Sequence, residues 1–208
     1  KDVNLKLIFI CSPNNPTGNS MNSNDMEFII RNFRGIVIID EAYIDFSGLP
    51  SFSLKIMQYP NLVVMQTFSK AFGLAAARIG MAFAGQEIIK YFFRLKPPYN
   101  ISTLNQAAAL KKLDDISESS DQVKKIIEER NRMAKSLAKL SVVKKVYPSD
   151  TNFLLVRVMN ADLIYNRLLE KGIIVRNRNR MVSNCLRITV GTADENRRMI
   201  SELEKIEL

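Results

Sequence analysis

The sequence of 208 residues contains no histidine. Ser-His-Asp triads and most catalytic zinc sites depend on an imidazole, so both kinds of site are excluded within this chain. Long hydrophobic runs are also missing: no segment approaches the roughly 20 consecutive apolar residues that a membrane-spanning helix needs. These absences indicate a globular chain whose chemistry depends on other side chains.

Cysteine is scarce. Cys11 and Cys185 are the only two cysteines, and they lie far apart with no Cys-x-x-Cys pairing. Such usage argues against a disulfide framework or a zinc site and favours a reducing compartment. We therefore expect a cytoplasmic protein without a metal site.

The charge of the chain is unbalanced. Lysine and arginine number 30 against 21 aspartate and glutamate residues, which gives a net charge of +9. The surplus is spread along the chain, and no basic run is interleaved with aromatic residues as in single-strand binders. We therefore expect no nucleic-acid or membrane partner. A solvated basic surface is the simplest interpretation of the charge, and anionic small molecules are the simplest partners.

The first half of the sequence alternates between two patterns. Short, continuously apolar runs predict strands that are covered on both faces, as in a parallel sheet. Capping residues followed by apolar residues at helical spacing predict helices between some of these strands. We expect strands at 5–11, 35–40, 61–66 and 79–85 and helices at 22–33 and 86–96. This alternation predicts an α/β fold.

The pattern changes after residue 100. A helix is expected at 103–113, and a long, highly charged one at 120–140 would connect two bodies. Strands at 152–158, 172–178 and 185–191 and helices at 161–172 and 193–206 follow. We therefore expect a large domain over 1–115 and a small α+β domain over 116–208.

Polar side chains follow or precede the predicted strands of the first domain. The carboxyl ends of parallel strands meet at one edge of a sheet, which is where open α/β sheets bind ligands. Taken singly, each side chain could be a turn residue, a cap or a surface charge. Together they predict a site. They are Asn15 after the first strand, Asp40 and Tyr43 after the second, Lys70 after the third and Arg78 before the fourth.

Five segments carry a resemblance that extends over nearly the whole chain. They are "SPNNPTG", "IIDEAYIDF", "TFSKAFGLAAARIG", "KPPYNIS" and "CLRITVGT". They resemble the motif series of fold type I pyridoxal-phosphate aminotransferases, and most closely that of the histidinol-phosphate aminotransferase family. The resemblance implies the C-terminal part of a large, mainly parallel-sheet domain, followed by a smaller α+β domain. Family members carry a substantial portion before "SPNNPTG", so we expect an N-terminal portion to be missing here.

The resemblance also implies pyridoxal 5'-phosphate as cofactor and a role for each strand-end residue. Lys70 would form the Schiff base and then move the proton, since a free amine can serve as nucleophile and base. Asp40 would pair with the pyridinium nitrogen, which keeps the ring an electron sink. Asn15 and Tyr43 would bind the ring oxygen. The phosphate would be held by Thr67, Ser69 and Arg78.

The implied reaction is transamination between a phosphorylated amino alcohol, histidinol phosphate, and 2-oxoglutarate, which yields glutamate, in a homodimer. Arg187 lies inside an apolar strand, where an unpaired cation would be costly. By the resemblance it binds the anionic end of the substrate, with Arg176 and Asn15. Arg178 and Arg180 would share a face with Arg176 if the strand persists, and a solvated strand edge is the preferred interpretation for these two.

Two alternatives stay open. A pyridoxal-phosphate decarboxylase acting on a phosphorylated amino acid would share the same Asn, Asp, Tyr, Lys and Arg set. A catalytically inactive fragment that only folds and dimerises would bind no cofactor.

Overall fold

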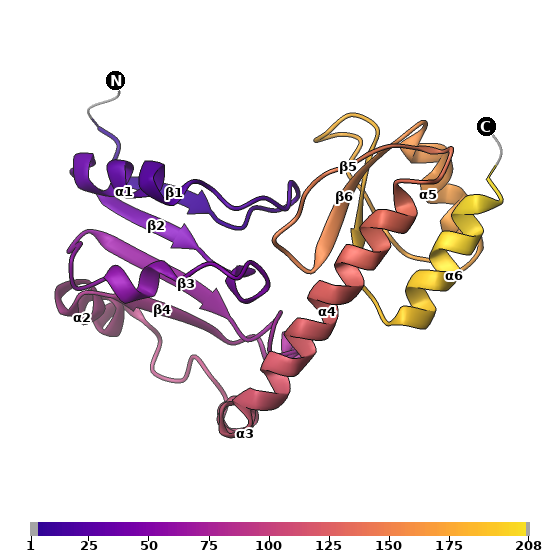
Figure 1. Cartoon of the computed structure of the whole chain (residues 1–208). Coiled ribbons are helices and arrows are strands. Elements are labelled where there is room, and N and C mark those ends of the chain that lie inside the picture. Colours follow the sequence, from indigo (N-terminus) through magenta and orange to yellow (C-terminus); the bar gives the residue numbers. More distant parts are fainter. Residues whose placement is uncertain (1–3, 207–208) are drawn as a thin grey trace. The chain divides into compact units, whose positions relative to one another are not determined.

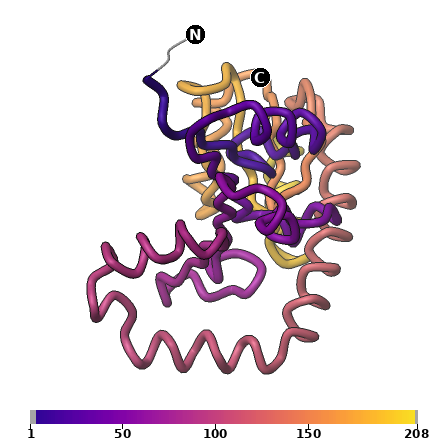
Figure 2. The backbone as a smooth tube through the Cα atoms, turned by 90° about the vertical axis from the view of Figure 1, so that its left-hand side faces the viewer, coloured from indigo at the N-terminus to yellow at the C-terminus, as the bar shows by residue number. Residues whose placement is uncertain are grey.

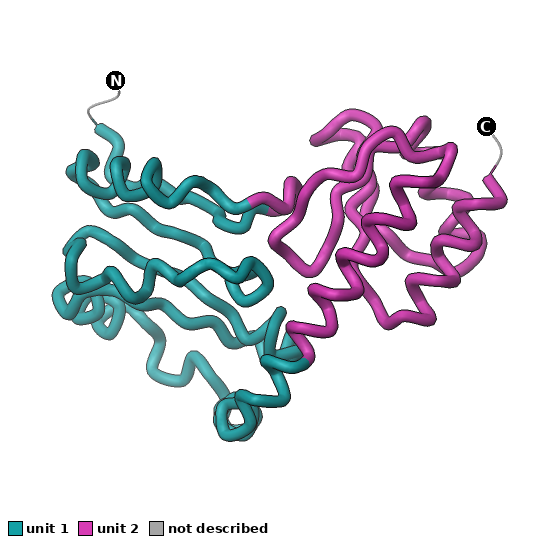
Figure 3. Tube along the Cα trace, in the orientation of Figure 1, with its two compact units in different colours: residues 1–14, 20–121 teal, residues 15–19, 122–208 magenta. Residues whose placement is uncertain are grey.

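The computed structural model describes residues 4–206, and the chain divides into two compact units (Figure 3). The first unit comprises residues 1–14 and 20–121, and the second comprises 15–19 and 122–208. The division falls inside one helix, α4 (Ile116–Leu137). The short segment 15–19 therefore belongs to the second unit although both of its neighbours in sequence belong to the first.

The first unit is built on a four-stranded sheet (Figure 1). Its strands lie in the order β1-β2-β3-β4, with β1 to β3 parallel and β4 antiparallel to β3. The mainly parallel α/β sheet expected from the sequence is confirmed, with β4 as the exception. The strands are β1 (Leu7–Cys11), β2 (Ile36–Asp40), β3 (Leu62–Thr67) and β4 (Gly80–Ala84).

Helix α1 (Ser23–Asn32) links β1 to β2. It begins where the Asn22 side chain accepts hydrogen bonds from the backbone N–H groups of Asn24 and Asp25, at 2.9 and 3.2 Å. This is the usual N-cap arrangement. Met26 and Ile30, one turn apart, are buried and belong to the same core cluster as sheet residues Val37, Ile39, Leu62 and Val64. The helix therefore covers one face of the sheet.

One expectation about this sheet is wrong for β1. Continuous apolarity predicts strands covered on both faces, yet Leu7 is 51% and Phe9 63% exposed in this structure. β1 is an outermost strand of this sheet, so it pairs with a neighbouring strand, β2, on one side. Sequence pattern identifies an apolar strand but does not identify what covers it.

The remaining elements of the first unit are three short 3₁₀ helices and two α-helices. The α-helices, α2 and α3, were expected from the sequence, and the trace continues from α3 into α4 (Figure 2). The 3₁₀ helices lie in connections where no regular element was expected. These elements are η1 (Ile44–Phe46), η2 (Phe52–Lys55), η3 (Ala75–Ala77), α2 (Gln86–Leu95) and α3 (Thr103–Asp114).

The second unit has an antiparallel sheet in the order β5-β6-β8-β7, together with α4, α5 and α6. Leu154, Val156, Leu186 and Ile188 alternate along β6 and β8 and share one core cluster with residues of all three helices. The α+β architecture expected for this half is confirmed. Its elements are β5 (Val143–Val146), β6 (Phe153–Val158), α5 (Ala161–Glu170), β7 (Arg176–Asn177), β8 (Cys185–Thr189) and α6 (Ala193–Glu204).

Strand β7 is much shorter than the strand expected at 172–178, since it comprises only Arg176 and Asn177. The chain then turns, and the carbonyl of Arg178 accepts hydrogen bonds from the N–H groups of Met181 and Val182, both at 2.8 Å. Arg178 and Arg180 therefore lie outside β7, and the condition under which all three arginines would share one strand face is not met. Within residues 4–206, no helix is both long enough and apolar enough to cross a membrane.

Candidate active site

In the first unit, three motif segments meet at one edge of the sheet. Asp40 is the last residue of β2, Thr67 is the last residue of β3, and Gly80, the first residue of β4, pairs with Thr67. Because β2 and β3 are parallel and β4 is antiparallel to them, all three lie at the same edge. The antiparallel direction of β4 thus places Arg78, two residues before it, beside the ends of the parallel strands.

The turn after β2 fixes Asp40 and Tyr43. Asp40 Oδ1 accepts a hydrogen bond from the N–H group of Ala42 at 3.0 Å, and Tyr43, which directly precedes η1, is buried. The neighbour of Asp40 on β1 is Cys11. Burial and, second, the Asp40 carboxylate raise the pKa of the Cys11 thiol, so this thiol is a neutral neighbour at physiological pH.

A hydroxyl-lined turn follows β3 and carries Lys70. Thr67 Oγ1 accepts from the N–H group of Ser69 at 3.1 Å and donates to the carbonyl of Ile79 at 3.3 Å. The turn closes at Gly73, whose N–H group donates to the Lys70 carbonyl at 3.1 Å and whose φ is +67°. Lys70 itself is exposed, and its Nζ lies 5.5 Å from the centre of the Tyr43 ring. The amine and the phenol are thus neighbours.

Arg78 ends η3 in a left-handed conformation, with φ 54° and ψ 41°. This conformation is disfavoured by about 1–2 kcal/mol for a residue other than glycine, and such outliers concentrate at functional sites. The guanidinium donates to the carbonyl of Ala75 at 3.0 Å and is exposed. The turn thereby holds a cation at the same sheet edge as Thr67.

The other predicted residues lie in the second unit. Arg187 Nη1 donates to Asn15 Oδ1 at 2.8 Å, and its guanidinium carbon lies 5.0 Å from the centre of the Phe153 ring. Arg176 is directly opposite Arg187 in the antiparallel pairing of β7 with β8. Side chains of such opposed residues share a face, and like charges there repel. An anion bound by both guanidinium groups would relieve that repulsion.

The structure places the predicted residues in two sets. Asp40, Tyr43, Thr67, Ser69, Lys70 and Arg78 belong to the first unit, and Asn15, Arg176 and Arg187 belong to the second. Asn15 was expected at the sheet edge of the first unit. It belongs to the same compact unit as Arg187, to which it is hydrogen-bonded.

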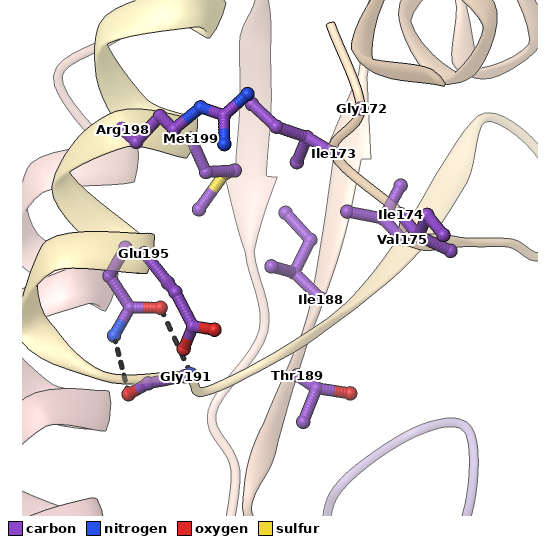
Figure 4. A pocket seen from close by; sticks show the side chains of 11 residues that line it. Gly172, Ile173, Ile174, Val175, Ile188, Thr189, Gly191, Glu195, Arg198 and Met199 are labelled. Carbon is purple, nitrogen blue, oxygen red and sulfur yellow. Dashed lines mark hydrogen bonds between the residues drawn. The ribbon is translucent and has the colours of Figure 1, made fainter.

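The second unit also contains a cavity of about 290 Å³ between the segment 172–175, β8 and α6 (Figure 4). Apolar side chains such as Ile173 and Met199 share its lining with the charged Glu195 and Arg198. Two hydrogen bonds of 3.0 Å join Gly191 to the buried Asn196 side chain, and they are marked in Figure 4. Asn196 and Glu195 therefore serve the start of α6, and the candidate arginine pair does not line this cavity.

Comparison with known proteins decides the family. A sequence profile described as "Aminotransferase class I and II" matches residues 1–203. The chain belongs to the class I and II aminotransferases. Among curated relatives, a histidinol-phosphate aminotransferase from Flavobacterium psychrophilum is 49% identical over 98% of this chain. The chain spans about 59% of that relative's length.

Solved structures extend the comparison to the fold. One of them is a histidinol-phosphate aminotransferase from Sinorhizobium meliloti in complex with pyridoxal-5'-phosphate. The match covers 97% of the chain described here and 57% of the Sinorhizobium chain, with a TM-score of 0.88 and 27% sequence identity. An L-threonine-O-3-phosphate decarboxylase from Porphyromonas gingivalis matches 97% of this chain and 64% of its own length, with a TM-score of 0.86 and 24% identity. The expected fold type I architecture is confirmed, and the fold alone does not separate the two activities.

The donor set in the first unit of the aminotransferase chain fits pyridoxal phosphate. Lys70 offers an exposed primary amine for covalent attachment, and Asp40 offers a carboxylate for the ring nitrogen. The hydroxyl of Ser69 and the guanidinium of Arg78 are donors suited to a dianionic phosphate, and Thr67 would join them by turning its hydroxyl away from the Ile79 carbonyl. These chemical types at one sheet edge are those that the cofactor requires.

Sequence reasoning missed two residues that the structure places beside the predicted ones. Phe153 lies under the Arg187 guanidinium, and Glu41, directly after Asp40, is only 1% exposed. No local signal singles out Glu41, because its hydrogen-bond partners lie 10 to 25 residues away along the chain. No local signal links Phe153 to Arg187, because the two residues meet only through the pairing of β6 with β8.

Proposed function

We propose that this chain carries the cofactor and substrate residues of a histidinol-phosphate aminotransferase that uses pyridoxal 5'-phosphate. The reaction would convert histidinol phosphate and 2-oxoglutarate to imidazole acetol phosphate and glutamate in histidine biosynthesis. One observation carries the proposal: β2 and β3 bring a carboxylate, a phenol and an amine to one sheet edge, in a chain 49% identical to a curated enzyme of that name.

The first unit would hold the cofactor. Thr67, Ser69 and Arg78 would bind its phosphate, and Asp40 would hold the proton on its ring nitrogen by a charge-assisted hydrogen bond. Tyr43 would donate to the ring oxygen, as would Asn15. The geometry supports this assignment because the Lys70 amine lies 5.5 Å from the Tyr43 ring centre, close enough for both to reach one planar ligand.

The second unit would hold the substrate. Arg176 and Arg187 face each other across paired strands and would bind the phosphate of histidinol phosphate or the carboxylates of glutamate. Asn15, which accepts from Arg187, would contact the same substrate. The stacking of Arg187 over Phe153 leaves its planar fork oriented by an apolar surface.

The catalytic step would be a proton transfer by Lys70. Pyridoxal phosphate, when bound, supplies an electron sink that makes the hydrogen on the amino-bearing substrate carbon acidic. The free Nζ of Lys70 would take up that proton as a base and later give it back as an acid. Asp40 would keep the ring nitrogen protonated throughout. A chain without histidine can perform this chemistry because the base is an amine.

A cytoplasmic homodimer completes the proposal. Both cysteines are free thiols in the structure, in keeping with a reducing compartment. Helices α2 and α3 expose large apolar side chains, including Phe93 at 68%, Leu95 at 81% and Leu104 at 83%. Exposed apolar surface of this kind marks an interaction site, which supports a partner on these helices.

The decisive test is covalent trapping at Lys70. We expect borohydride reduction in the presence of pyridoxal phosphate to label a peptide containing Lys70, and Lys70→Ala to abolish the label without unfolding the protein. Lys90→Ala, on the exposed surface of α2, is the matched control and should leave the label intact. The experiment is done on this chain and on the full-length gene product. Labelling of another lysine instead would refute the assignment.

The two alternatives predict different products. A decarboxylase of a phosphorylated amino acid would release carbon dioxide without consuming 2-oxoglutarate, whereas the proposed enzyme would form glutamate. An inactive fragment would give no label at Lys70. The comparison with the Porphyromonas gingivalis decarboxylase makes the first of these the more important measurement.

A further inference from the structure

Past their last paired residues, β2 and β3 part into the two loops that carry the candidate site. Asp40 and Met65 form the final pair, and the N–H group of Glu41 donates to the Met65 carbonyl at 2.8 Å. Beyond that bond, the segment after β2 leads to Tyr43 and the segment after β3 leads to Lys70. Backbone pairing between these two strands therefore ends just before the residues whose spacing matters most.

A buried side-chain bridge continues the connection where the backbone pairing stops. The Glu41 carboxylate accepts hydrogen bonds from Ser51 Oγ at 2.5 Å, Phe52 N–H at 2.7 Å and Gln66 Nε2 at 2.9 Å. Gln66 also donates to Ser51 Oγ at 3.1 Å, which closes the network. Glu41 is 1% exposed. The bridge thus joins the residue after Asp40 to the residue before Thr67.

Burying a carboxyl group such as that of Glu41 costs free energy unless hydrogen bonds satisfy its oxygens. All three donors are neutral, and they use both oxygens of the side chain: Phe52 N–H donates to Oε1, and Ser51 and Gln66 donate to Oε2. An amide has only one acceptor oxygen, so it could not accept the same three hydrogen bonds. The carboxylate therefore fixes its neighbours more rigidly than an amide would.

We propose that Glu41 is a positioning residue, which acts through Gln66 to set the separation between Asp40 and the Thr67–Lys70 turn. The inference rests on the proposed function, because it assigns the bridge to the binding of one rigid cofactor by both loops. Glu41 touches neither cofactor nor substrate in this assignment. With a merely structural role, the loss of cofactor affinity in each variant would follow its loss of stability.

Two variants separate these roles, because each removes a different arm. Gln66→Met cuts the arm to β3. Ser51→Ala removes the hydrogen bonds of Ser51 to Glu41 and Gln66 and keeps the one from Phe52 N–H. It also removes the cap of η2, since Ser51 Oγ accepts from Ser53 N–H at 3.0 Å. Ser51→Ala should therefore cost at least as much stability as Gln66→Met, while it leaves the Glu41–Gln66 contact in place. It is the matched control.

The measurement is the affinity of the full-length gene product for pyridoxal phosphate, titrated by fluorescence quenching after removal of bound cofactor, with thermal unfolding of the same samples. We expect Gln66→Met to weaken cofactor binding by about tenfold and Ser51→Ala to change it by less than about threefold. The exchanged pair Glu41→Gln with Gln66→Glu restores a carboxylate–amide contact and should recover most of the affinity. If Gln66→Met does not fold, Gln66→Asn, whose amide is too short to reach Glu41, replaces it with the same expectation.

The possible outcomes are distinct. Equal weakening by Gln66→Met and Ser51→Ala, unchanged affinity in Gln66→Met, or no recovery in the folded exchanged pair would each overturn the positioning role. In those cases, labelling of Lys70 in the unmodified protein would leave the proposed function standing. Absence of cofactor binding by the unmodified protein would overturn both.

Discussion

Gly18 occupies a position in the segment 15–19 where only the smallest residue fits. Its φ is +82°, and a Cβ added there would lie 2.8 Å from Ser149 Oγ and 3.1 Å from Ser149 Cβ. Its carbonyl accepts from the N–H group of Asp150 at 2.7 Å. The glycine therefore lets the backbone approach the 149–151 turn closely, which helps to hold the segment that carries Asn15 on the second unit.

Replacing Gly18 with alanine should destabilise the second unit by about 2–4 kcal/mol, because left-handed strain and a steric clash add together. Gly172→Ala is the matched control: its φ is +70°, but its nearest contact would be Arg198 Nη2 at 3.9 Å. The control should cost only the strain, about 1–2 kcal/mol. Urea unfolding measures both. Equal losses would show that the Ser149 contact is irrelevant.

For single residues, the sequence predicts which side chains could serve a site. It says less about the hydrogen bonds and contacts that hold those side chains in place. Lys70 and Asp40 could be singled out because each follows a strongly apolar run. Glu41 could not, since its three partners lie 10 to 25 residues away along the chain. Long-range hydrogen bonds leave no local pattern.

Helix α6 shows how far an individual element can be read from sequence. Its N-terminus has a complete capping box, in which Thr192 accepts from Glu195 N–H while Glu195 accepts from the N–H and hydroxyl groups of Thr192. The pattern Thr-x-x-Glu predicts this start directly. Strand β7 is the contrary case, because a turn stabilised by contacts between Arg178 and 181–182 ends it early. The sequence predicts a local capping motif, but it does not predict whether a turn or a strand forms where both are possible.

Thr192→Ala should destabilise the second unit by about 1 kcal/mol, while Thr192→Ser, which keeps the hydroxyl, should be nearly neutral. Denaturant unfolding of the three proteins at neutral pH measures the difference. An equal loss in both variants would mean that the hydroxyl does not cap the helix.

The same capping box makes a pH-dependent contribution. Hydrogen bonds from the Thr192 N–H and hydroxyl lower the pKa of Glu195. A carboxyl whose pKa is lower in the folded state stabilises the fold above its unfolded pKa, and this stabilisation is lost as pH falls through the folded value. Glu195→Gln should therefore be less stable than the unmodified protein at neutral pH, and the difference should shrink below about pH 4. A difference that does not change with pH would contradict this.

For the whole molecule, the sequence predicts two bodies and the class of each, and the structure adds where the chain passes between them. A boundary was expected near residue 115 because the texture of the sequence changes there. The two compact units divide at residues 121 and 122, within α4, and the segment 15–19 belongs to the second unit. Contacts such as Arg187 to Asn15 decide this, and they connect residues separated by most of the chain.

The substrate assignment rests on two arginines of a chain that is basic as a whole, with a net charge of +9. A test must therefore separate specific phosphate binding from general attraction of anions. If Arg176 and Arg187 bind a phosphate, Arg176→Ala should lower kcat/KM for histidinol phosphate about ten- to a hundredfold more than for glutamate. Arg180→Ala removes the same charge from an exposed position outside β7 and is the matched control. Half-reactions of the full-length gene product measure the ratio. Equal losses for both substrates would indicate general anion binding.

The antiparallel return of β4 also bears on the order of folding. Pairing Thr67 with Gly80 closes only the loop 68–79, whereas pairing β1 with β2 must close the whole crossover through α1. Short loops cost less entropy to close, and contacts close in sequence tend to form first. We therefore expect the amides of β3 and β4 to be protected before those of β1 in pulse-labelled hydrogen exchange during refolding. Thr67, Ser69, Lys70 and Arg78 would then be assembled as a local hairpin before the parallel part of the sheet is complete.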